Sequence, residues 1–233
     1  MKADKRLSAA SMHIVLSRDY GTTISSGRVY RLMKSMDLPK MSTVKPKFRY
    51  HKPTVSLDYP NILNQQFDPN EPNRAWVSDI TYIPVKNKFV YLCVILDLFS
   101  RKVIAWKLSH RMTASLVIDT LDTALNHRQP NESVLFHSDR GSQYTSVACR
   151  QFLDTHNLIA SYSKPGYPYD NAVIESFFKY LKRDELNRRN FHSLEEVSLA
   201  AFSCIEGWYN NKRSHSHNTM LTPNEKEELF YQL

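Results

Sequence analysis

WVSDITYIPVKNKFVYLCVILDLFSRKVIAWKL, residues 76–108, is the stretch of this chain that decides its fold. Residues 76–85, 89–99 and 102–108 within it are rich in Val, Ile, Tyr and Phe, and short breaks separate them. β-Branched and aromatic residues favour strands, and such short breaks favour tight turns. The stretch therefore predicts three strands joined as an antiparallel meander.

Helices and strands alternate after this meander. Residues 113–127 are predicted to form a helix, because apolar residues line one side of it at helical spacing: Leu116, Val117, Leu121, Ala124 and Leu125. Short apolar strands are then predicted at 133–137 and 158–162, and helices at 146–155, 171–189 and 194–211. This order predicts an α/β fold, a mixed five-stranded sheet with helices on its faces.

Basic residues concentrate in the N-terminal third of the chain. Residues 1–75 hold 13 Lys or Arg against 6 Asp or Glu, whereas the other 158 of the 233 residues hold 18 against 17. A basic flank on a nearly neutral body favours a polyanion-binding segment beside a separate working domain. We favour nucleic-acid binding as the interpretation of this charge distribution, and a soluble protein that is merely basic is the alternative.

Two short helices around a turn at residues 20–21 are predicted within residues 1–38. The second begins at Ser25 or Ser26, and its apolar side is formed by Val29, Leu32, Met33 and Met36. Its opposite face carries the basic residues Arg28, Arg31 and Lys34. We expect this face to contact DNA, with an ordinary solvated helix as the alternative.

Residues 39–75 are predicted to be a basic, proline-rich linker. Six of the eleven prolines lie here, among basic residues that include Lys45, Lys47 and Arg49. Proline at this density favours extended backbone. Such a segment can follow a phosphate backbone or simply connect two domains.

Membrane and disulfide-based classes are not indicated. The N-terminus is polar, and no apolar run approaches the roughly 20 residues that a membrane-spanning helix needs. Cys93, Cys149 and Cys204 are widely spaced and form no CxxC pair. We therefore expect a reducing compartment and neither a disulfide framework nor a structural zinc site.

Three carboxylates lie at the ends or edges of separate predicted elements. Asp79 is in the first strand, Asp139 follows the fourth strand, and Glu175 opens a helix. Carboxylate oxygens from three elements are suited to a hard divalent ion such as Mg²⁺. On the helix, Glu175 shares one face with Lys179 and Lys182, while the apolar residues Ile174, Phe177 and Leu181 project from the other side. A surface Glu–Lys pair is the alternative interpretation.

The surrounding motifs resemble those of a known family. Thirty-five residues separate Asp139 from Glu175, and Lys182 follows the Glu by seven. The strings HSDRGSQY (137–144) and YDNAVIESFF (169–178) are similar to those of bacterial insertion-sequence transposases. The likeness is to the second-reading-frame product, whose catalytic domain resembles retroviral integrase. It covers residues 74–225, and the first forty residues resemble the helix-turn-helix that precedes this domain in the family.

The resemblance implies a ribonuclease-H-like catalytic core at 76–225, followed by a tail at 226–233. Asp79, Asp139 and Glu175 would hold two Mg²⁺ ions, with Mn²⁺ able to substitute, for strand cleavage by water and strand transfer by the freed 3′-hydroxyl. Lys182 would contact DNA phosphate. The resemblance implies supporting roles for His137, for Gln143 and for Asn171, the last of them at the start of the Glu175 helix.

The implied partners are double-stranded DNA, as terminal inverted repeats and as target, further copies of this chain, and a first-frame partner protein. The implied location is the bacterial cytoplasm, in association with the nucleoid. Three alternatives compete with this interpretation. A ribonuclease H or a resolvase uses a different carboxylate set, and a retroviral integrase would carry a His₂Cys₂ zinc module, whereas no cysteine precedes Cys93. An inactive or domesticated transposase that only binds DNA is the remaining alternative.

Overall fold

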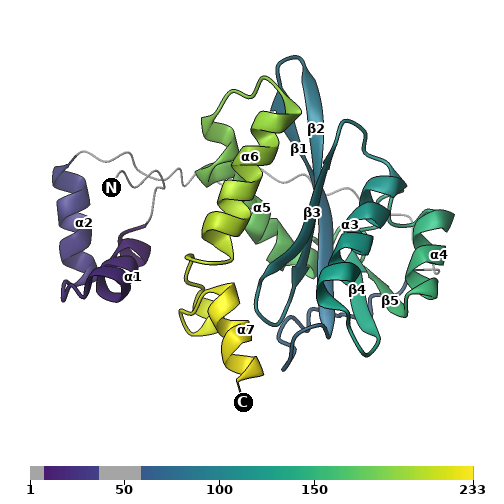
Figure 1. Ribbon diagram of the computed structural model, residues 1–233, viewed down its shortest axis with the longest axis horizontal. Helices are drawn as coiled ribbons and strands as arrows, with labels where there is room; N and C mark the ends of the chain where they lie inside the picture. Colours follow the sequence, from purple (N-terminus) through teal and green to yellow (C-terminus); the bar gives the residue numbers. More distant parts are fainter. Residues whose placement is uncertain (1–7, 37–58, 233) are drawn as a thin grey trace. The chain divides into compact units, whose positions relative to one another are not determined.

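The strands predicted from the sequence form one mixed sheet. In the computed structural model of the chain, which describes residues 8–36 and 59–232, five strands lie in the order β3-β2-β1-β4-β5 (Figure 1). Their bounds are β1 Ala75–Val85, β2 Lys88–Asp97, β3 Val103–Ser109, β4 Val134–Ser138 and β5 Leu158–Tyr162. β2 pairs antiparallel with β1 and β3, and β4 pairs parallel with β1 and β5. The predicted meander and the mixed five-stranded sheet are confirmed.

Helices cover both faces of this sheet. On one face α5 (Ala172–Asp184) and α6 (Leu194–Cys204) pack against Leu92, Val94 and Leu96 of β2. On the other face α3 (Ala114–Arg128) and α4 (Val147–Thr155) cover Cys93 and Ile95. A strand buried on both faces has no polar side, which explains the unbroken apolar run of β2.

The helices α5 and α6 are both shorter than the sequence predicts. α5 ends at Asp184 and is followed by a 3₁₀ turn at Leu186–Arg188. α6 ends at Cys204 and passes into a π-helical turn at Ile205–Tyr209. Just beyond that turn, the Asn210 side chain accepts a hydrogen bond from the Val103 N–H (3.0 Å) and donates one to the Val103 carbonyl (2.9 Å). This bidentate contact binds the end of the helix to the outer edge of β3. The change from α-helical to π-helical winding thus occurs where the helix contacts the sheet.

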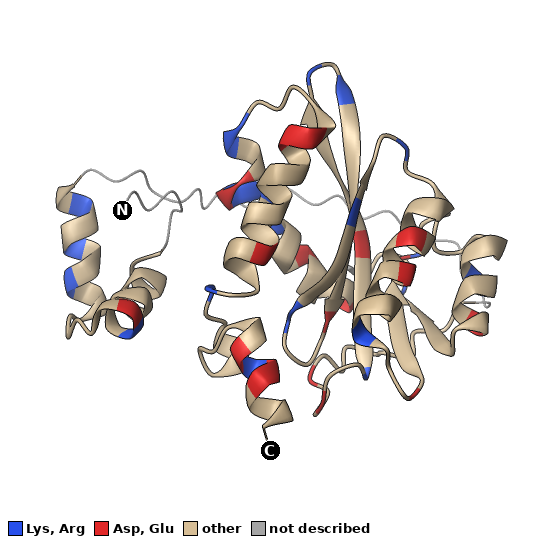
Figure 2. Cartoon of the chain, viewed as in Figure 1, with Lys and Arg blue, Asp and Glu red and all other residues tan. Residues whose placement is uncertain are grey.

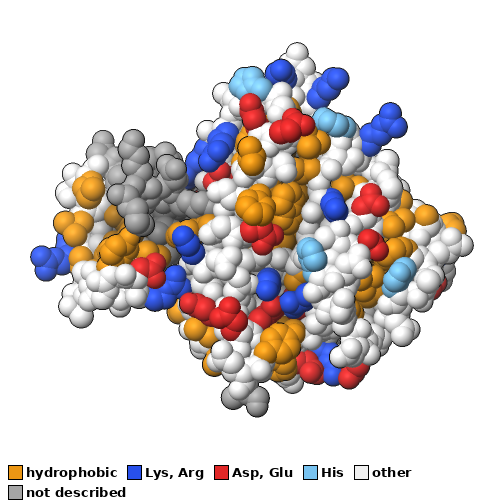
Figure 3. Space-filling model, in the orientation of Figure 1, with side chains coloured by type: hydrophobic (Ala, Val, Ile, Leu, Met, Phe, Trp, Pro, Cys, Tyr) orange, Lys and Arg blue, Asp and Glu red, His pale blue; other side chains and the backbone are white. Residues whose placement is uncertain are grey.

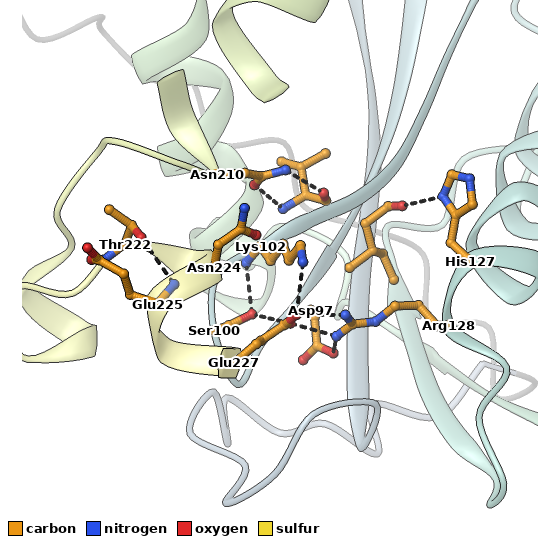
Figure 4. A network of polar contacts seen from close by, with 12 residues as sticks. Asp97, Ser100, Lys102, His127, Arg128, Asn210, Thr222, Asn224, Glu225 and Glu227 are labelled. Atoms are coloured by element: carbon orange, nitrogen blue, oxygen red, sulfur yellow. Dashed lines mark hydrogen bonds and ion pairs between the residues drawn. The ribbon is translucent and has the colours of Figure 1, made fainter. Parts of the chain in front are cut away.

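Residues 226–231, predicted as part of a C-terminal tail, belong to a helix that packs on the core. α7 spans Pro223–Tyr231 and begins with a capping box between Thr222 and Glu225. Glu227 on this helix is buried and pairs with Arg128 of α3 and with Lys102, while Arg128 also pairs with Asp97 (Figure 4). The boundary at residue 226 followed the extent of the family resemblance. The sequence does not reveal the contacts of Glu227, because its partners Lys102 and Arg128 lie far from α7 along the chain.

The described part of the predicted linker packs on the core. Leu63 is 2% exposed, the Phe67 carbonyl accepts a hydrogen bond from Arg101 (2.8 Å), and the Asn73 N–H donates to Asp97 (2.8 Å). Residues 59–75 therefore differ from an open linker, because their backbone polar groups find partners on the sheet and its loops. Lys45, Lys47 and Arg49 lie outside the described residues.

The chain divides between Arg49 and Tyr50 into two units, and the first contains a helix pair. α1 (Ala9–Tyr20) and α2 (Ser26–Ser35) are capped by Ser8 and Ser25. Gly21 ends α1 at φ +61°, a conformation that favours glycine. The predicted turn and the Ser25 cap are confirmed.

The apolar side predicted for α2 is only partly confirmed, and Met33 is half-buried. Val29 is buried, but Leu32 and Met36 are 48% and 68% exposed. Two short helices have too little surface to cover a whole apolar stripe. Arg28, Arg31 and Lys34 are exposed and follow one another along α2 (Figure 2).

Within the described residues, no helix is both long and apolar enough to cross a membrane.

Candidate active site

Asp79 lies on β1, and Asp139 directly follows the end of β4, the parallel strand next to it. Val77 of β1 pairs with His137 of β4, and each aspartate lies two residues further along its own chain segment. Residues two apart on a strand face the same side, so Asp79 lies with Val77 on the α5 side of the sheet. Asp139 interacts electrostatically with Asp79 from the loop that follows β4. β4 pairs with β1 only at Ala75–Val77. The edge of β1 at Asp79 is therefore not paired with β4.

α5 lies beside this part of β1 and carries Glu175. The Asn171 side chain donates a hydrogen bond to the Ser78 carbonyl (3.3 Å), which binds the start of the helix to β1. Asn171 occupies the N-cap position, but its side chain makes no capping hydrogen bond to the first turn of the helix. Ile174, Phe177 and Leu181 are buried, as the helix pattern predicts, and Glu175 is exposed in the first turn.

The three carboxylates and Lys182 influence one another electrostatically. Burial and then the charge of Asp139 raise the pKa of Asp79 to about 7, with a smaller contribution from Glu175, while the Ile80 N–H and Lys182 oppose the rise. Burial also raises the pKa of Glu175, and Lys179 opposes it. Burial lowers the pKa of Lys182, and Asp79 opposes this. The structure thus gathers residues that are far apart in the sequence into one charged centre.

This centre has the donor chemistry of a divalent-cation site. All three groups offer hard oxygen ligands, and the repulsion that raises the pKa of Asp79 is what a bound cation relieves. Across residues 8–36 and 59–232, no three or more His, Cys, Asp or Glu side chains are already close enough together to hold a metal ion. The carboxylates therefore fit a cation in type and charge, and binding would require their side chains to draw closer.

A tight loop orients Asp139. The Gly141 N–H donates to Asp139 Oδ1 (2.9 Å), and a Cβ at position 141 would lie 3.0 Å from that oxygen and 3.1 Å from Oε1 of Gln143. The Gln143 amide donates to the Met112 carbonyl (3.2 Å), in the segment just before α3. Arg140 donates to the carbonyl of Ser163 (3.0 Å). A side chain larger than glycine at position 141 would disturb the Asp139 carboxylate.

His137 lies fully buried in the sheet. Its two ring nitrogens lie 2.8 and 3.0 Å from the hydroxyls of Ser161 and Ser163. Burial lowers the pKa of His137 to about 4, so the ring is neutral near pH 7. Ser161 Oγ also accepts the N–H groups of Ile62 and Leu63 (2.9 and 3.0 Å). The histidine therefore belongs to a network that joins β4, β5 and the segment before β1.

Two residues near the centre escaped the sequence reasoning, although both lie in the quoted motifs. Asp170 is 2% exposed and accepts hydrogen bonds from Asn61 (2.9 Å), Gln65 (2.8 Å) and the Lys164 N–H (2.9 Å). It holds the loop before Glu175 against the segment that precedes β1. The Tyr144 hydroxyl lies 2.9 Å from Ser78 Oγ, directly next to Asp79 in sequence.

The basic residues assigned to DNA occupy different places. Lys182 extends towards β1, where its Nζ lies 4.6 Å from the centre of the Tyr82 ring. Lys179 is exposed on α5. Arg28, Arg31 and Lys34 belong to the N-terminal unit and are exposed there. Within residues 59–232, the structure brings Lys179 and Lys182 next to the carboxylates.

Comparisons with known proteins agree with the fold and identify the family. Two family models, each described as "Integrase core domain", match residues 69–168 and 157–223. The transposase for insertion sequence element IS904 of Lactococcus lactis is 40% identical over 209 residues, which are 89% of this chain and 82% of that protein. Transposase InsF for insertion sequence IS3A of Escherichia coli is 42% identical over 167 residues, 72% of this chain and 58% of that protein.

A solved structure shows the same fold. The catalytic core domain of HTLV-2 integrase in complex with magnesium is 18% identical, with a TM-score of 0.52, and the match covers 68% of this chain and 98% of that one. The mixed sheet with helices on both faces and the integrase-core matches define a class, the ribonuclease-H-like polynucleotidyl transferases. Within that class, the chain belongs to the bacterial insertion-sequence transposases of the DDE/integrase family.

Proposed function

We propose that this transposase cuts DNA at the ends of an insertion sequence and joins the freed 3′-hydroxyl to a new phosphate. Asp79, Asp139 and Glu175 act as its catalytic carboxylates. The observation that carries the proposal is their electrostatic convergence, in which Asp139 and Glu175 both raise the pKa of Asp79. Groups that repel one another in this way are kept together at sites of function more often than elsewhere.

The same carboxylates are the proposed ligands of two Mg²⁺ ions, with Mn²⁺ able to replace them. Bound divalent ions activate an attacking oxygen and stabilise a leaving one in an in-line displacement at phosphorus. The chain's own contribution is to position its side chains. β1 holds Asp79, the Gly141 N–H orients Asp139, and the bond from Asn171 to Ser78 sets the start of α5 and hence Glu175.

Lys182 is the proposed phosphate contact beside the carboxylates. Its ammonium group interacts with Asp79, so a phosphate bound at the centre lies within its electrostatic reach. Lys179, Arg28, Arg31 and Lys34 are proposed to bind DNA further away, together with Lys45, Lys47 and Arg49. The proposed partners are duplex DNA, as terminal repeats and target, and further copies of this chain that pair the two ends. A first-frame protein is a further proposed partner, and the nucleoid in the cytoplasm is the proposed location.

The test uses duplex DNA that carries the terminal repeats of the insertion sequence encoding this chain. In the presence of Mg²⁺ the full chain should nick these ends, and ends that are already nicked should be joined to a second duplex. Glu175→Gln should lower both activities by roughly 100-fold or more, the size of loss seen when a group that stabilises charge in the transition state is removed. The matched control, Glu228→Gln at an exposed position of α7, should retain activity. Equal activity of Glu175→Gln and the unaltered chain would refute the proposal.

A further inference from the structure

An exposed aromatic pair adjoins the carboxylate centre, and the function proposed above leaves it unused. Tyr82 on β1 and Phe89 on β2 are 58% and 51% exposed. Their ring centres lie 5.2 Å apart, with the ring planes at 79°. Single exposed aromatic side chains are ordinary, but two in contact form a contiguous apolar surface, which marks a candidate binding site.

The pair lies on a part of the sheet that no helix covers among the described residues. In the β1–β2 register Tyr82 pairs with Tyr91 and Pro84 pairs with Phe89, so all four lie on the same face. Further along β2 this face is buried beneath α3. At the hairpin end Tyr82, Pro84 and Phe89 are all exposed. The aromatic pair therefore lies where the helical layer stops.

Lys182 connects this surface to the carboxylates. Asp79 and Tyr82 are three residues apart on β1, so they project from opposite faces, about 10 Å apart along the strand. Lys182 comes from α5, beside the part of β1 that β4 does not pair. Its Nζ lies 4.6 Å from the centre of the Tyr82 ring, and its charge interacts with Asp79. Lys182 therefore contacts the aromatic pair and interacts with the carboxylate centre, so a DNA strand that ran from one to the other would pass it.

The charges around the aromatic pair favour a polyanion. Lys86 and Lys88 are exposed at the tip of the same hairpin, where Figure 2 shows basic residues, and Lys179 is exposed on α5. Residues 80–96 contain no Asp or Glu. Aromatic rings flanked by lysines, without nearby carboxylates on the same hairpin, are the combination that binds single-stranded nucleic acid by stacking.

We propose that Tyr82 and Phe89 bind unpaired DNA bases, those of the strand end next to the phosphate held at the carboxylates. The inference rests on the proposed function, because it takes DNA at Asp79, Asp139 and Glu175 as given. Bases inside a duplex are stacked on both sides, and a paired end offers only the outer face of its last base pair. Unpaired bases can turn out and insert beside both rings, so this surface favours DNA whose end has opened over DNA whose end is paired. A second protein is the competing occupant, and the lysines argue against it.

The test measures binding by the full chain in EDTA, where cleavage does not occur. One probe is a blunt duplex, and the other is the same duplex with a short unpaired 5′ extension that contains 2-aminopurine. The extension should tighten Kd by roughly 5- to 150-fold, the equivalent of one stacked base. The 2-aminopurine fluorescence should fall on binding, because stacking quenches it.

The variants separate stacking from other roles. Phe89→Ala should lose the preference for the extension and the quenching, and Phe89→Trp should retain both. Phe202→Ala removes a ring that is also 58% exposed, from the hydrophobic surface over α6 (Figure 3), and should change neither.

Three results would overturn the inference: equal affinity of the unaltered chain for the two probes, an equal loss on both probes in Phe89→Ala, or a changed oligomeric state of Phe89→Ala with the DNA preference intact. A chain that prefers the extension but never cuts in Mg²⁺ would refute the proposed function and leave this inference standing.

Discussion

Replacing Asp79 by Asn should stabilise the metal-free protein. The pKa of this carboxyl rises from 3.8 to about 7, chiefly through burial and then through Asp139. Each pH unit is worth about 1.4 kcal/mol, so the ionised form costs the fold up to about 4 kcal/mol. Asn keeps the shape of the side chain and an oxygen for the Ile80 N–H, which donates to Asp79 Oδ1 at 2.7 Å.

The direction of the pH dependence follows from linkage. The folded-state pKa lies above the unfolded value, so the folded protein holds this proton more tightly than the unfolded chain does. Wild-type stability is therefore lost as the pH rises from about 4 through about 7. Asp79→Asn should be more stable than the wild type by up to about 4 kcal/mol at pH 8, roughly 10 °C in Tm, and nearly equal to it at pH 4.

Urea unfolding in EDTA measures this difference. All three tryptophans, Trp76, Trp106 and Trp208, lie in the unit that contains the carboxylates, so their fluorescence reports its unfolding. Asp119→Asn, an exposed aspartate on α3, is the matched control and should change stability by less than about 0.5 kcal/mol. Added Mg²⁺ should stabilise the wild type and narrow the gap. A variant no more stable than the wild type at pH 8, or a gain that persists at pH 4, would contradict the electrostatic account.

Two further predictions concern buried polar groups. Arg128→Met should lower the free energy of unfolding by about 3–5 kcal/mol, because Asp97 and Glu227, with side chains 0% and 6% exposed, would lose their shared cation. Arg150→Met, at an exposed site on α4, should change it little, and a small effect of Arg128→Met in urea unfolding would show that the network of Figure 4 is not stabilising. Burial lowers the pKa of His137 to about 4, so folding opposes protonation of the ring. The wild type should therefore lose up to about 3 kcal/mol of stability as the pH falls from 6.5 to about 4. His137→Gln should not show this loss. The same acid sensitivity in His137→Gln and the wild type would exclude this source.

Local patterns predicted the strands more accurately than the helix ends. The predicted strand at 133–137 is β4 Val134–Ser138, and the one at 158–162 has the bounds of β5. β-Branched and aromatic runs between turns mark a strand from its own residues. The predicted helix at 171–189 instead ends at Asp184, where Arg183 pairs with the carboxylate of Asp184 (2.7 Å) and Asp184 is buried. Contacts with the rest of the fold decide such an end, and periodicity does not report them.

The supporting residues show a similar limit. The sequence motif drew attention to His137 and Asn171, but their partners were not predictable. His137 bonds to Ser161 and Ser163 of a strand and loop more than twenty residues away. Asn171 bonds to the backbone of Ser78, 93 residues away. Hydrogen bonds between distant segments depend on the order in which the strands lie in the sheet. The residues of one segment do not reveal which other segments will lie beside it.

The amino-acid sequence by itself determined the α/β class, the order of strands and helices, and the placement of Asp79, Asp139 and Glu175 on three separate elements, because propensity and periodicity are local properties. Only the tertiary structure decided that β4 leaves the edge of β1 uncovered beyond Val77 and that α5 lies there. The same arrangement leaves Tyr82 and Phe89 exposed beside Lys182. Strand order and helix docking are set by long-range burial of apolar surface, to which every part of the chain contributes at once.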